Sequence, residues 1–408
     1  MLKSGLVKAE INYAAVFDYF VFSKIEGEEE GMFARIFELQ QATNFEFSIA
    51  EKKIKKWKYY ILPFTNKFET FNDDQFQNLV QQTRELIFQS IRLRLRSDVA
   101  VGSCLSGGID SSSIVSIMNE LLKNKNKKIN VFTASFTDAK IDEGKWAKQI
   151  VDCTNSEWSR TYPTADELKN DLEKLTYCQD IPIWSTSTYA QYRVMQLAKE
   201  KGVKVILDGQ GGDELWAGYP HHQAIYLREL LVNLKWKEAK ALLATAGKFN
   251  SNVLWFAKQY LKHSGLSGFP SFMIPGIYKK YFNHIQLLNP DFFNQYKNRF
   301  ENYFEIAPKT LNEILSKETT SSLLKAYLKC EDRCSMWHSV ESRTPFADDI
   351  NLVELAFQTP SVYKIHNSES KYILRKAMYN IVPDSILQRK DKMGYNTPNS
   401  GLHILNRL

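Results

Sequence analysis

A short polar stretch, LSGGIDSSS (105–113), carries the residue types whose chemistry is easiest to interpret. It follows an apolar segment at 99–105 that we expect to be a strand, and it opens a segment with a helical pattern. Glycines at such a turn let backbone N–H groups approach an anion closely, and the helix N-terminus adds partial positive charge. The hydroxyls of Ser106, Ser111 and Ser112 add further donors. The stretch therefore predicts a phosphate-binding loop.

Asp110 lies among these donors, where a carboxylate would repel a phosphate unless a cation lay between them. We therefore interpret Asp110 as a Mg²⁺ ligand, because Mg²⁺ binds carboxylate oxygens next to substrate phosphates. The loop is not a Walker A motif, since no Gly-Lys-Ser or Gly-Lys-Thr follows at the spacing of that motif.

Strand and helix patterns alternate in the segment that contains this loop. Helical segments separate four stretches that we expect to be strands, at 99–105, 129–136, 158–164 and 203–209. Strands joined by helices in this way form a parallel sheet with helices on both faces. Ligands bind such sheets beyond the carboxyl ends of the strands, near the point where the strand order reverses. The first polar loop and a second one, DGQGGDELWAGY (208–219), are both predicted to lie at that level.

The remaining segments are predicted to flank this core. Residues 1–65 have an irregular pattern and hold no complete domain, and an amphipathic helix begins near Asn72. We expect a core at 66–225, a helical insertion at 226–320 and a helical C-terminal lobe at 321–408. The expected fold class is α/β, with a doubly wound and mostly parallel sheet.

Composition and charge exclude several classes of protein. The net charge is +7 over 408 residues, and no nucleic-acid-binding motif accompanies the short lysine clusters. No apolar run approaches the roughly 18 residues that a membrane helix needs. The five cysteines are odd in number and irregularly spaced, which is typical of reduced thiols. We therefore expect a cytoplasmic protein that acts on small molecules, with neither nucleic acid nor membrane as a partner.

Several motifs, taken in order, resemble those of a known family. SGGIDSS (106–112) resembles the pyrophosphate-binding loop of the N-type ATP pyrophosphatases, which cleave ATP between the α and β phosphates. Further motifs resemble the synthetase domain of the glutamine-dependent asparagine synthetases: LDGQGGDELWAGY, DRCSMWHSVESRTPFAD, ESKYILRKAM and PDSILQRKDKMGYNTP. The resemblance covers residues 70–225 and 321–398 well and the middle of the chain less well.

The resemblance implies a site for ATP and Mg²⁺. Its nucleotide contacts would be Leu105, Ser106, Gly107, Gly108, Asp110, Ser111 and Ser112 for the phosphates, Asp208 and Gly209 for the AMP part, and Ala134 for the adenine side. Asp213 matches the family's second acidic metal ligand, which would act beside Asp110. Lys371 matches the lysine that stabilises charge on the departing pyrophosphate.

The reaction that the resemblance implies has two steps. A carboxylate, which in this family is the aspartate side chain, attacks the α phosphorus of MgATP and displaces pyrophosphate. Ammonia then attacks the acyl-adenylate and leaves an amide and AMP. The asparagine synthetases commonly carry GEG where this chain has GQG, and Gln210 is an amide that cannot act as a base near neutral pH. Glu214 is a nearby carboxylate that could substitute, although a helix-start residue is the plainer interpretation.

A second departure concerns the family's glutaminase domain, which begins with a catalytic cysteine. Here Met1 is followed by Leu2, and the first cysteine is Cys104. We expect residues 1–65 to be the tail segment that follows a glutaminase. The chain is then either a fragment or an enzyme that takes ammonia directly or from a separate glutaminase. The oligomeric state stays open, a homodimer included.

Three functions follow from these observations. The first is an ATP-dependent, AMP-forming amide ligase that makes asparagine. The second keeps the adenylation and changes the acceptor, as in sugar-acid amidation or in β-lactam and lasso-peptide ring closure, and Gln210 favours it. The third is an inactive ATP-binding remnant, against which the presence of Asp110, Asp213 and Lys371 counts.

Overall fold

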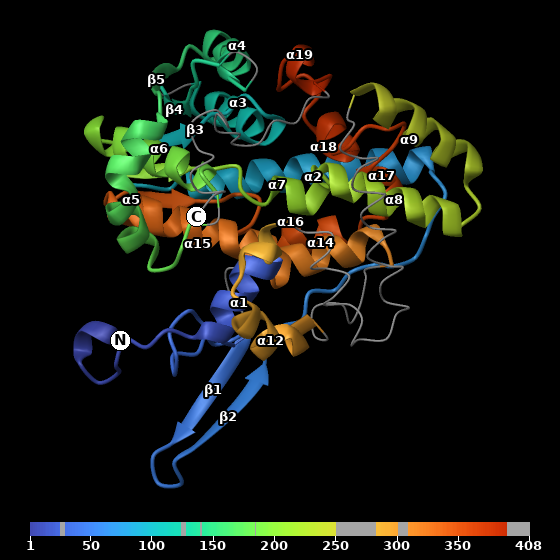
Figure 1. Cartoon of the computed structure of the whole chain (residues 1–408). Helices are drawn as coiled ribbons and strands as arrows, with labels where there is room; N and C mark the ends of the chain where they lie inside the picture. The colour runs from blue at the N-terminus through green and yellow to red at the C-terminus, as the bar shows by residue number, and fades with distance from the viewer. Residues whose placement is uncertain are drawn as a thin grey trace. The chain divides into compact units, whose positions relative to one another are not determined.

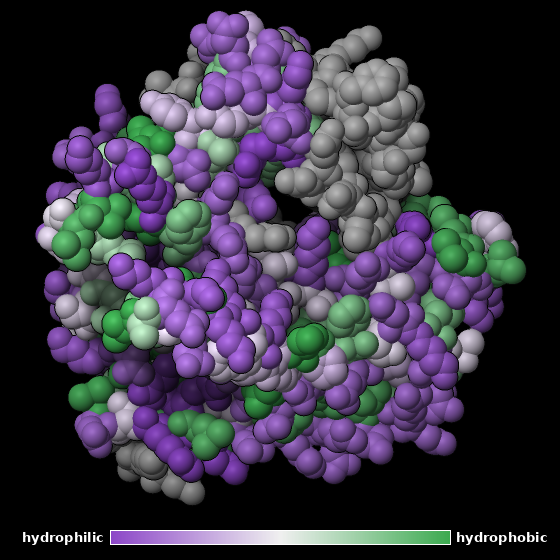
Figure 2. Space-filling model, turned by 90° about the horizontal axis from the view of Figure 1, so that it is seen from below, coloured by the Kyte–Doolittle hydropathy of each residue, from purple (hydrophilic) through white to green (hydrophobic). Residues whose placement is uncertain are grey.

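The computed structural model describes residues 1–24, 29–123, 128–138, 141–183, 185–249, 283–300 and 309–389. Contacts divide the chain into a smaller unit, Met1–Pro63 with Trp255–Lys309, and a larger unit, Phe64–Leu254 with Thr310–Leu408. Among the described helices, none is long and apolar enough to span a bilayer. The face shown in Figure 2 is mostly hydrophilic, and its hydrophobic side chains lie in small separate groups, as on an ordinary water-exposed surface.

A parallel sheet lies at the centre of the larger unit (Figure 1). Its five strands, in spatial order, are β5 (Glu157–Thr161), β4 (Asn130–Ala134), β3 (Val101–Cys104), β6 (Val205–Leu207) and β7 (Glu341–Arg343). All neighbouring strands pair in parallel. The chain moves outward from β3 in one direction and then returns to place β6 on its other side, so the strand order reverses between β3 and β6. This topology confirms the predicted α/β fold class.

Two details of the sheet differ from the expectation. The strand expected at 158–164 is β5, which ends at Thr161. It cannot continue, because Pro163 has no N–H to donate and Thr164 caps the next helix by accepting from Glu167 N at 3.2 Å. The second difference is β7, a polar segment of three residues that the sequence pattern does not mark as a strand. It forms because Glu341 N donates to Lys204 O at 2.8 Å and aligns the segment on β6.

Helices cover the sheet on both sides. Contacts join α3 (Ile109–Leu122) to β3 and α4 (Gly144–Thr154) to β4, whereas α6 (Ser187–Glu200) packs on β4 and β5. A hydrophobic cluster joins α6 with α5 (Ala165–Gln179) and α15 (Leu323–Trp337) over the sheet residues Phe132 and Ile206. Burying each such side chain stabilises the fold by about 1.5–3 kcal/mol. Figure 1 shows these two groups of helices on either side of the strands.

The other helices of the larger unit complete its frame. Asn72, predicted near the start of a helix, caps α2 (Asp73–Arg94) by accepting from Gln75 N at 2.9 Å. The remaining helices among its described residues are α7 (Gly212–Trp216), α8 (Pro220–Val232), α9 (Trp236–Phe249), α14 (Leu311–Thr320), α16 (Ile350–Gln358), α17 (Ser361–Lys364), α18 (Tyr372–Ala377) and α19 (Asp384–Leu387). Residues 250–282 of the expected insertion, and residues 390–398 of the last motif, lie outside the described residues.

The smaller unit is more regular than its sequence pattern suggests. It contains the short helices η1 (Leu2–Ser4), η4 (Asn283–Leu287) and η5 (Lys297–Arg299), the helices α1 (Tyr13–Phe22) and α12 (Pro290–Tyr296), and the antiparallel hairpin of β1 (Thr43–Ser48) and β2 (Lys53–Lys58). Phe17 on α1 packs against the aromatic rings of α12 and Phe300. Arg299 donates to both carboxylate oxygens of Asp18, at 2.7 and 2.6 Å.

Candidate active site

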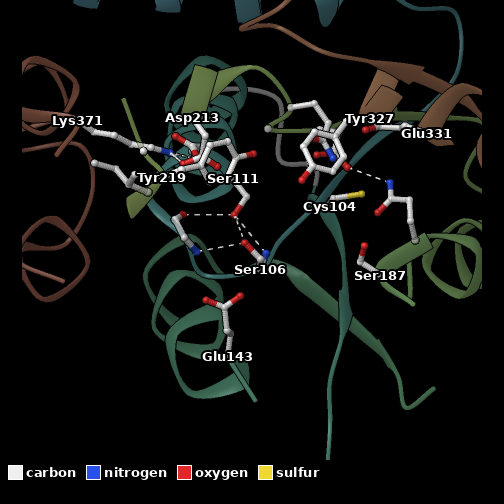
Figure 3. Close-up of a pocket in the computed structure, with 18 of the residues that line it drawn as sticks. Cys104, Ser106, Ser111, Glu143, Ser187, Asp213, Tyr219, Tyr327, Glu331 and Lys371 are labelled. Atoms are coloured by element: carbon white, nitrogen blue, oxygen red, sulfur yellow. Dashed lines mark hydrogen bonds and ion pairs between the residues drawn. The ribbon is translucent and has the colours of Figure 1, made fainter. Parts of the chain in front are cut away.

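A polar cavity of about 330 Å³ lies where the strand order reverses. The loops that follow β3 and β6 form part of its wall, as expected for an open parallel sheet. Helix α15, the start of α6, and the segments around α18 and α19 also line it, so residues far apart in the sequence share one pocket (Figure 3).

The loop after β3 is held by its own hydroxyl groups. The Ser106 and Ser111 hydroxyls lie 3.1 Å apart, and the Ser106 hydroxyl accepts from Gly108 N at 3.2 Å. Gly107 has a φ of +79°, and a Cβ there would lie 2.5 Å from the backbone nitrogen of Ala147. The loop thus needs glycine at this position, and Ser106 and Ser111 line the pocket.

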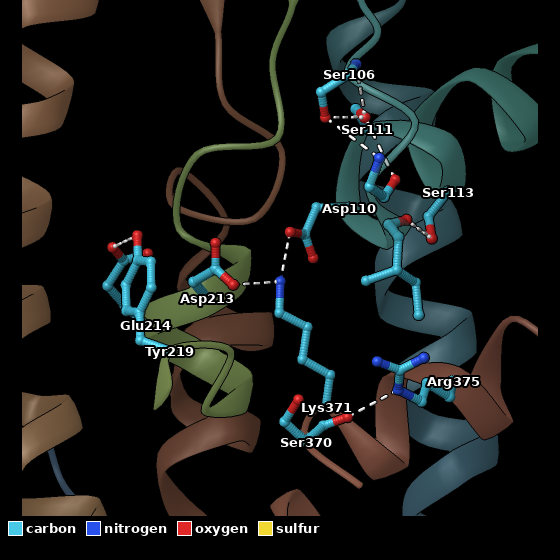
Figure 4. A network of polar contacts seen from close by, with 12 residues as sticks. Ser106, Asp110, Ser111, Ser113, Asp213, Glu214, Tyr219, Ser370, Lys371 and Arg375 are labelled. Carbon is cyan, nitrogen blue, oxygen red and sulfur yellow. Dashed lines mark hydrogen bonds and ion pairs between the residues drawn. The ribbon is translucent and has the colours of Figure 1, made fainter. Parts of the chain in front are cut away.

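Lys371 lies between the two carboxylates that the sequence predicts as metal ligands (Figure 4). Its Nζ forms an ion pair with Asp213 Oδ1 at 2.6 Å and a second ion pair with Asp110. The three residues come from the start of α3, the start of α7 and the residue before α18. The side chain is buried, with 2% of the residue exposed. A buried lysine is stable here because two carboxylates compensate its charge.

The backbone around this ion pair is specialised. Lys371 has φ 54° and ψ 33°, a left-handed conformation that costs free energy for a residue with a Cβ and that is concentrated at functional sites. A Cβ at Gly218 would lie 1.7 Å from Asp213 Oδ1 and 2.4 Å from Lys371 Cε. Any side chain at position 218 would therefore displace one partner of the ion pair.

The donor set suits Mg²⁺. Asp110 and Asp213 are both buried and converge on one point, beside the loop that the sequence predicts to hold phosphate. Together they carry two negative charges against the single charge of Lys371, and the net negative charge that remains attracts a divalent cation. The residues present therefore fit the group that the sequence predicts.

Two arginines that sequence reasoning missed also line the cavity. Arg375 donates to Ser370 O at 2.8 Å, and Arg389 donates to Gly107 O at 3.2 Å. Arg389 also pairs with Glu143 and so joins the segment after α19 to the phosphate-binding loop. In the sequence, Arg375 and Arg389 are single basic residues in a helix pattern, and such residues more often lie on a solvated surface. Only the fold brings them to the pocket.

Glu214 lies behind the ion pair and outside the lining of the cavity. It accepts a hydrogen bond from the Tyr219 hydroxyl at 2.9 Å. Burial, together with the charge of Asp213, raises the pKa of Glu214 to about 7. Its predicted role as a substitute base is thus not supported by direct access to the pocket, whereas Tyr219 does line it.

Tyr219 is held in turn by a cluster of His221, His222 and Glu318. Glu318 on α14 contacts the Nε2 atoms of His221 and His222 at 2.7 and 2.6 Å. Burial alone would raise the pKa of Glu318, but the two imidazoles outweigh it and lower that pKa to about 2. The His221 ring stacks on Tyr219 at 5.5 Å with an interplanar angle of 12°.

The same three groups have the spacing of a metal site, because their ligand atoms lie within 4.8 Å of one another. The protonation of His222 argues for hydrogen bonding instead. Its Nδ1 accepts from Tyr219 N at 3.3 Å, so its Nε2 carries a hydrogen and donates to Glu318. The cluster therefore fixes the loop that holds Tyr219.

The far side of the cavity holds a buried carboxyl pair, Asp208 and Glu331. Gln191 Nε2 donates to Asp208 Oδ2 at 3.1 Å, and the Ser342 hydroxyl donates to Glu331 Oε1. Burial raises the pKa of Glu331 well above its usual range, and the charge of Asp208 raises it further, while the polar contacts with Ser342 and Gln210 oppose the shift. Sequence reasoning missed Glu331, which directly precedes the motif DRCSMWHSVESRTPFAD.

Most of the predicted site residues meet at the cavity. Those that line it are Ser106, Gly108, Asp110, Ser111, Asp208, Gly209, Gln210, Asp213 and Lys371. Five others lie outside its lining: Leu105, Gly107, Ser112, Ala134 and Glu214. Leu105 and Ser112 are buried beside the loop, and Ala134 is partly buried against the hydrophobic cluster under the sheet.

A family model described as asparagine synthase matches residues 82–408 of the sequence. The chain belongs to the asparagine synthase family. The match includes all the predicted site residues and the five strands of the parallel sheet. The resemblance that the motifs indicated is thereby confirmed.

Several members of the asparagine synthase family and two fungal amidases are similar in sequence. The glutamine-hydrolyzing asparagine synthetase 1 of Bacillus subtilis (strain 168) is 30% identical over 345 residues, which cover 78% of this chain and 50% of that protein. A putative asparagine synthetase of Methanocaldococcus jannaschii is 30% identical over 56% of this chain and 42% of its own length. The amidase chry2 of Gibberella zeae is 23% identical over 82% of this chain and 55% of its own length. The chain thus spans about half the length of these relatives.

Among solved structures, the NH3-dependent NAD synthetase of Campylobacter jejuni is similar with a TM-score of 0.24 and 13% identity. The match covers 59% of this chain and 98% of that one. A TM-score this low carries no argument about function, which must come from the site itself.

Proposed function

We propose that this member of the asparagine synthase family is an ATP-dependent, AMP-forming amide ligase. It would adenylate a carboxylate, with the aspartate side chain as the first candidate, and transfer ammonia to it. The observation that carries the proposal is Lys371, held in a buried ion pair with Asp110 and Asp213 beside a hydroxyl-rich phosphate loop. That arrangement can bind and neutralise a pyrophosphate.

The residues of the cavity divide the work of the first step. The loop from Ser106 to Ser111 would hold the phosphates through hydroxyl and backbone donors, with Asp110 and Asp213 as the carboxylates that hold Mg²⁺. When bound, Mg²⁺ supplies positive charge to the oxygens of the departing pyrophosphate. Lys371 places a fixed cation at the same charge, and its burial makes that interaction stronger than it would be in water.

The first step forms a bond between a substrate carboxylate oxygen and the α phosphorus and breaks the bond to pyrophosphate. The acyl-adenylate that results is prone to hydrolysis. The buried walls of the cavity, which include Asp208, Asp213 and Lys371, restrict the access of water to it. Ammonia then replaces AMP at the acyl carbon and gives the amide.

The test is the release of pyrophosphate from MgATP in the presence of ammonium chloride, with and without aspartate. We expect release that depends on aspartate, with asparagine and AMP formed in equal amounts. Folded protein that binds ATP and releases no pyrophosphate with any carboxylic acid would contradict the proposal. The same assay with glutamine in place of ammonium tests the source of nitrogen, and we expect no turnover with glutamine and this chain alone.

A second candidate keeps the adenylation and changes the acceptor. Gln210 favours this second candidate, because Gln210 lines the cavity and its amide cannot act as a base. ATP–pyrophosphate exchange with a panel of carboxylic acids, sugar acids and amino acids included, separates the two candidates. Exchange that depends on another acid and not on aspartate would select the second.

A further inference from the structure

Two buried acceptor atoms on the wall opposite Lys371 receive no hydrogen bond from the part of the chain that the structure describes. They are Glu331 Oε2 and Gln191 Oε1. Both residues line the cavity, and only 2% of Glu331 and 4% of Gln191 is exposed. An unsatisfied buried acceptor costs about 1–3 kcal/mol, so each such atom needs an explanation. A bound group that donates hydrogen bonds to both atoms would explain why they are unsatisfied.

The rest of this wall fixes the two acceptors in place. The Ser342 hydroxyl holds the other oxygen of Glu331, and Gln191 uses its Nε2 to donate to Asp208 at 3.1 Å. The acceptors therefore cannot turn toward other partners without breaking these bonds. Figure 3 shows Glu331 on the side of the pocket with Tyr327, Cys104 and Ser187, away from Lys371 and Asp213.

The charges around the pocket are segregated in the same way. The cations among its described lining residues are Lys371, Arg375 and Arg389, and all three bind groups of the phosphate side. The titratable groups that face Glu331 are Asp208 at the end of β6, Cys104 at the end of β3 and Cys330 on its own helix. Burial raises the pKa of both carboxyl groups of the pair above that of an ordinary surface carboxyl.

We propose that Glu331, Gln191 and Asp208 form the subsite for the attacking amine, and that the Glu331–Asp208 pair accepts the proton that leaves its nitrogen. This inference rests on the proposed function. The amine has the donors that Glu331 Oε2 and Gln191 Oε1 lack. A small neutral or cationic amine fits this wall, whereas an anionic substrate group would meet two carboxyls and no cation there.

The step balances with ammonia as the amine. The nitrogen lone pair forms the C–N bond to the acyl carbon, and the C–O bond to AMP breaks, with its electrons leaving on the phosphate oxygen. The nitrogen loses one proton, which goes to a carboxylate oxygen of the pair. This assigns to Glu331 and Asp208 the proton acceptance that Gln210 cannot perform.

The test separates the two half-reactions with the variant Glu331→Gln, which keeps the size and polarity of the side chain. We expect ATP–pyrophosphate exchange within threefold of the wild type and amide formation at least 100-fold slower, so that AMP accumulates through hydrolysis of the adenylate. At a constant concentration of unprotonated ammonia, amide formation by the wild type should also rise with pH as the pair loses its proton, and this rise should vanish in the variant. Glu173→Gln, an exposed glutamate on α5, is the matched control and should change neither half-reaction.

Two results would overturn the inference: amide formation by Glu331→Gln near the wild-type rate, or an equal loss of exchange and amide formation in folded protein. If Glu331→Gln does not fold, the variant Ser342→Ala tests the same inference. It frees Glu331 to turn, and it should slow amide formation more than exchange; equal effects would again contradict the inference. Absence of exchange in the wild type itself would refute the proposed function instead, so the two failures are distinguishable.

Discussion

Lys371 Nζ lies 2.6 Å from Asp213 Oδ1, although the two residues belong to distant segments of the sequence. The ion pair forms because Gly218 leaves room for both side chains. A fixed cation next to a carboxylate that is proposed to bind Mg²⁺ would be pre-organised for a polyphosphate, since it needs no rearrangement when charge develops.

Replacing Lys371 should therefore abolish the first half-reaction. We expect Lys371→Gln to slow ATP–pyrophosphate exchange by about 10²–10³-fold, the effect of removing one fixed charge or donor from a transition state. Steady-state exchange assays check this. Lys376→Gln, an exposed lysine on α18, is the control. Normal exchange by Lys371→Gln would remove the lysine from the proposed mechanism.

Asp110 should be required for the metal and dispensable for the fold. In Asp110→Asn one of two carboxylates is lost, so we expect exchange to fall below detection and the Mg²⁺ concentration needed for ATP binding to rise. The melting temperature should stay within a few degrees of the wild-type value. Glu120→Gln on the same helix is the control, because that glutamate is exposed. Undiminished exchange by Asp110→Asn would show that the metal is held elsewhere.

Gly218 should not tolerate a side chain. A Cβ would lie 1.7 Å from Asp213 Oδ1, so Gly218→Ala must displace the carboxylate or the loop. We expect the free energy of unfolding in urea to fall by about 1–3 kcal/mol and exchange to be lost. Gly31→Ala, where the nearest atom is 3.4 Å from the new Cβ, should be tolerated. Equal tolerance at both positions would mean that the loop moves freely.

Glu214 should make stability depend on pH. Its pKa is raised to about 7 in the folded state, so between the unfolded value near 4.5 and pH 7 the folded state binds more protons than the unfolded state. The free energy of unfolding should therefore fall as pH rises through this interval. In Glu214→Gln this contribution is absent. As pH rises from 5 to 8, the free energy of unfolding of the variant should therefore increase relative to that of the wild type by up to about 3 kcal/mol. Urea unfolding at a series of pH values measures the difference, and parallel curves would contradict the shifted pKa.

The cluster of Glu318 with His221 and His222 should behave as a hydrogen-bond clamp and not as a metal site. We expect Glu318→Leu to lower the free energy of unfolding by about 1–3 kcal/mol, because it leaves the His222 N–H without an acceptor. Zn²⁺ and chelators should leave the melting temperature of the wild type unchanged. A rise with one equivalent of Zn²⁺ that Glu318→Leu abolishes would establish a metal site instead.

The sequence predicted those parts of the fold and site that depend on neighbouring residues. The loop from Ser106 to Ser112 could be read directly, because glycine, hydroxyl and carboxylate act together over a few positions. The parallel sheet followed from the alternation of strand and helix patterns. Lys371 could be placed only through the resemblance to a family, since a lone lysine on a helix is usually solvated.

Other features have no local signal. Glu331, Arg375 and Arg389 become pocket residues only when α15 and the segment from α18 onward fold back beside the loops that follow β3 and β6. The three residues of β7 are a strand only because β6 pairs with them. Helix α1 was not predicted, because NYAAVFDYFVF is aromatic on most sides and shows no single apolar face.

The position of β7 has a consequence for synthesis. Residues 208–340 lie between β6 and β7, the strand that pairs with the edge of β6. Lys371, the ion-pair partner of Asp213, is synthesised later still. At about 5–20 residues per second, a ribosome needs on the order of ten seconds to cover that distance. During that time β6 has an open edge and Asp110 and Asp213 lack the cation that neutralises them. The loop after β3 is therefore synthesised long before the pocket is complete, and the pocket forms only after the C-terminal segment has folded back.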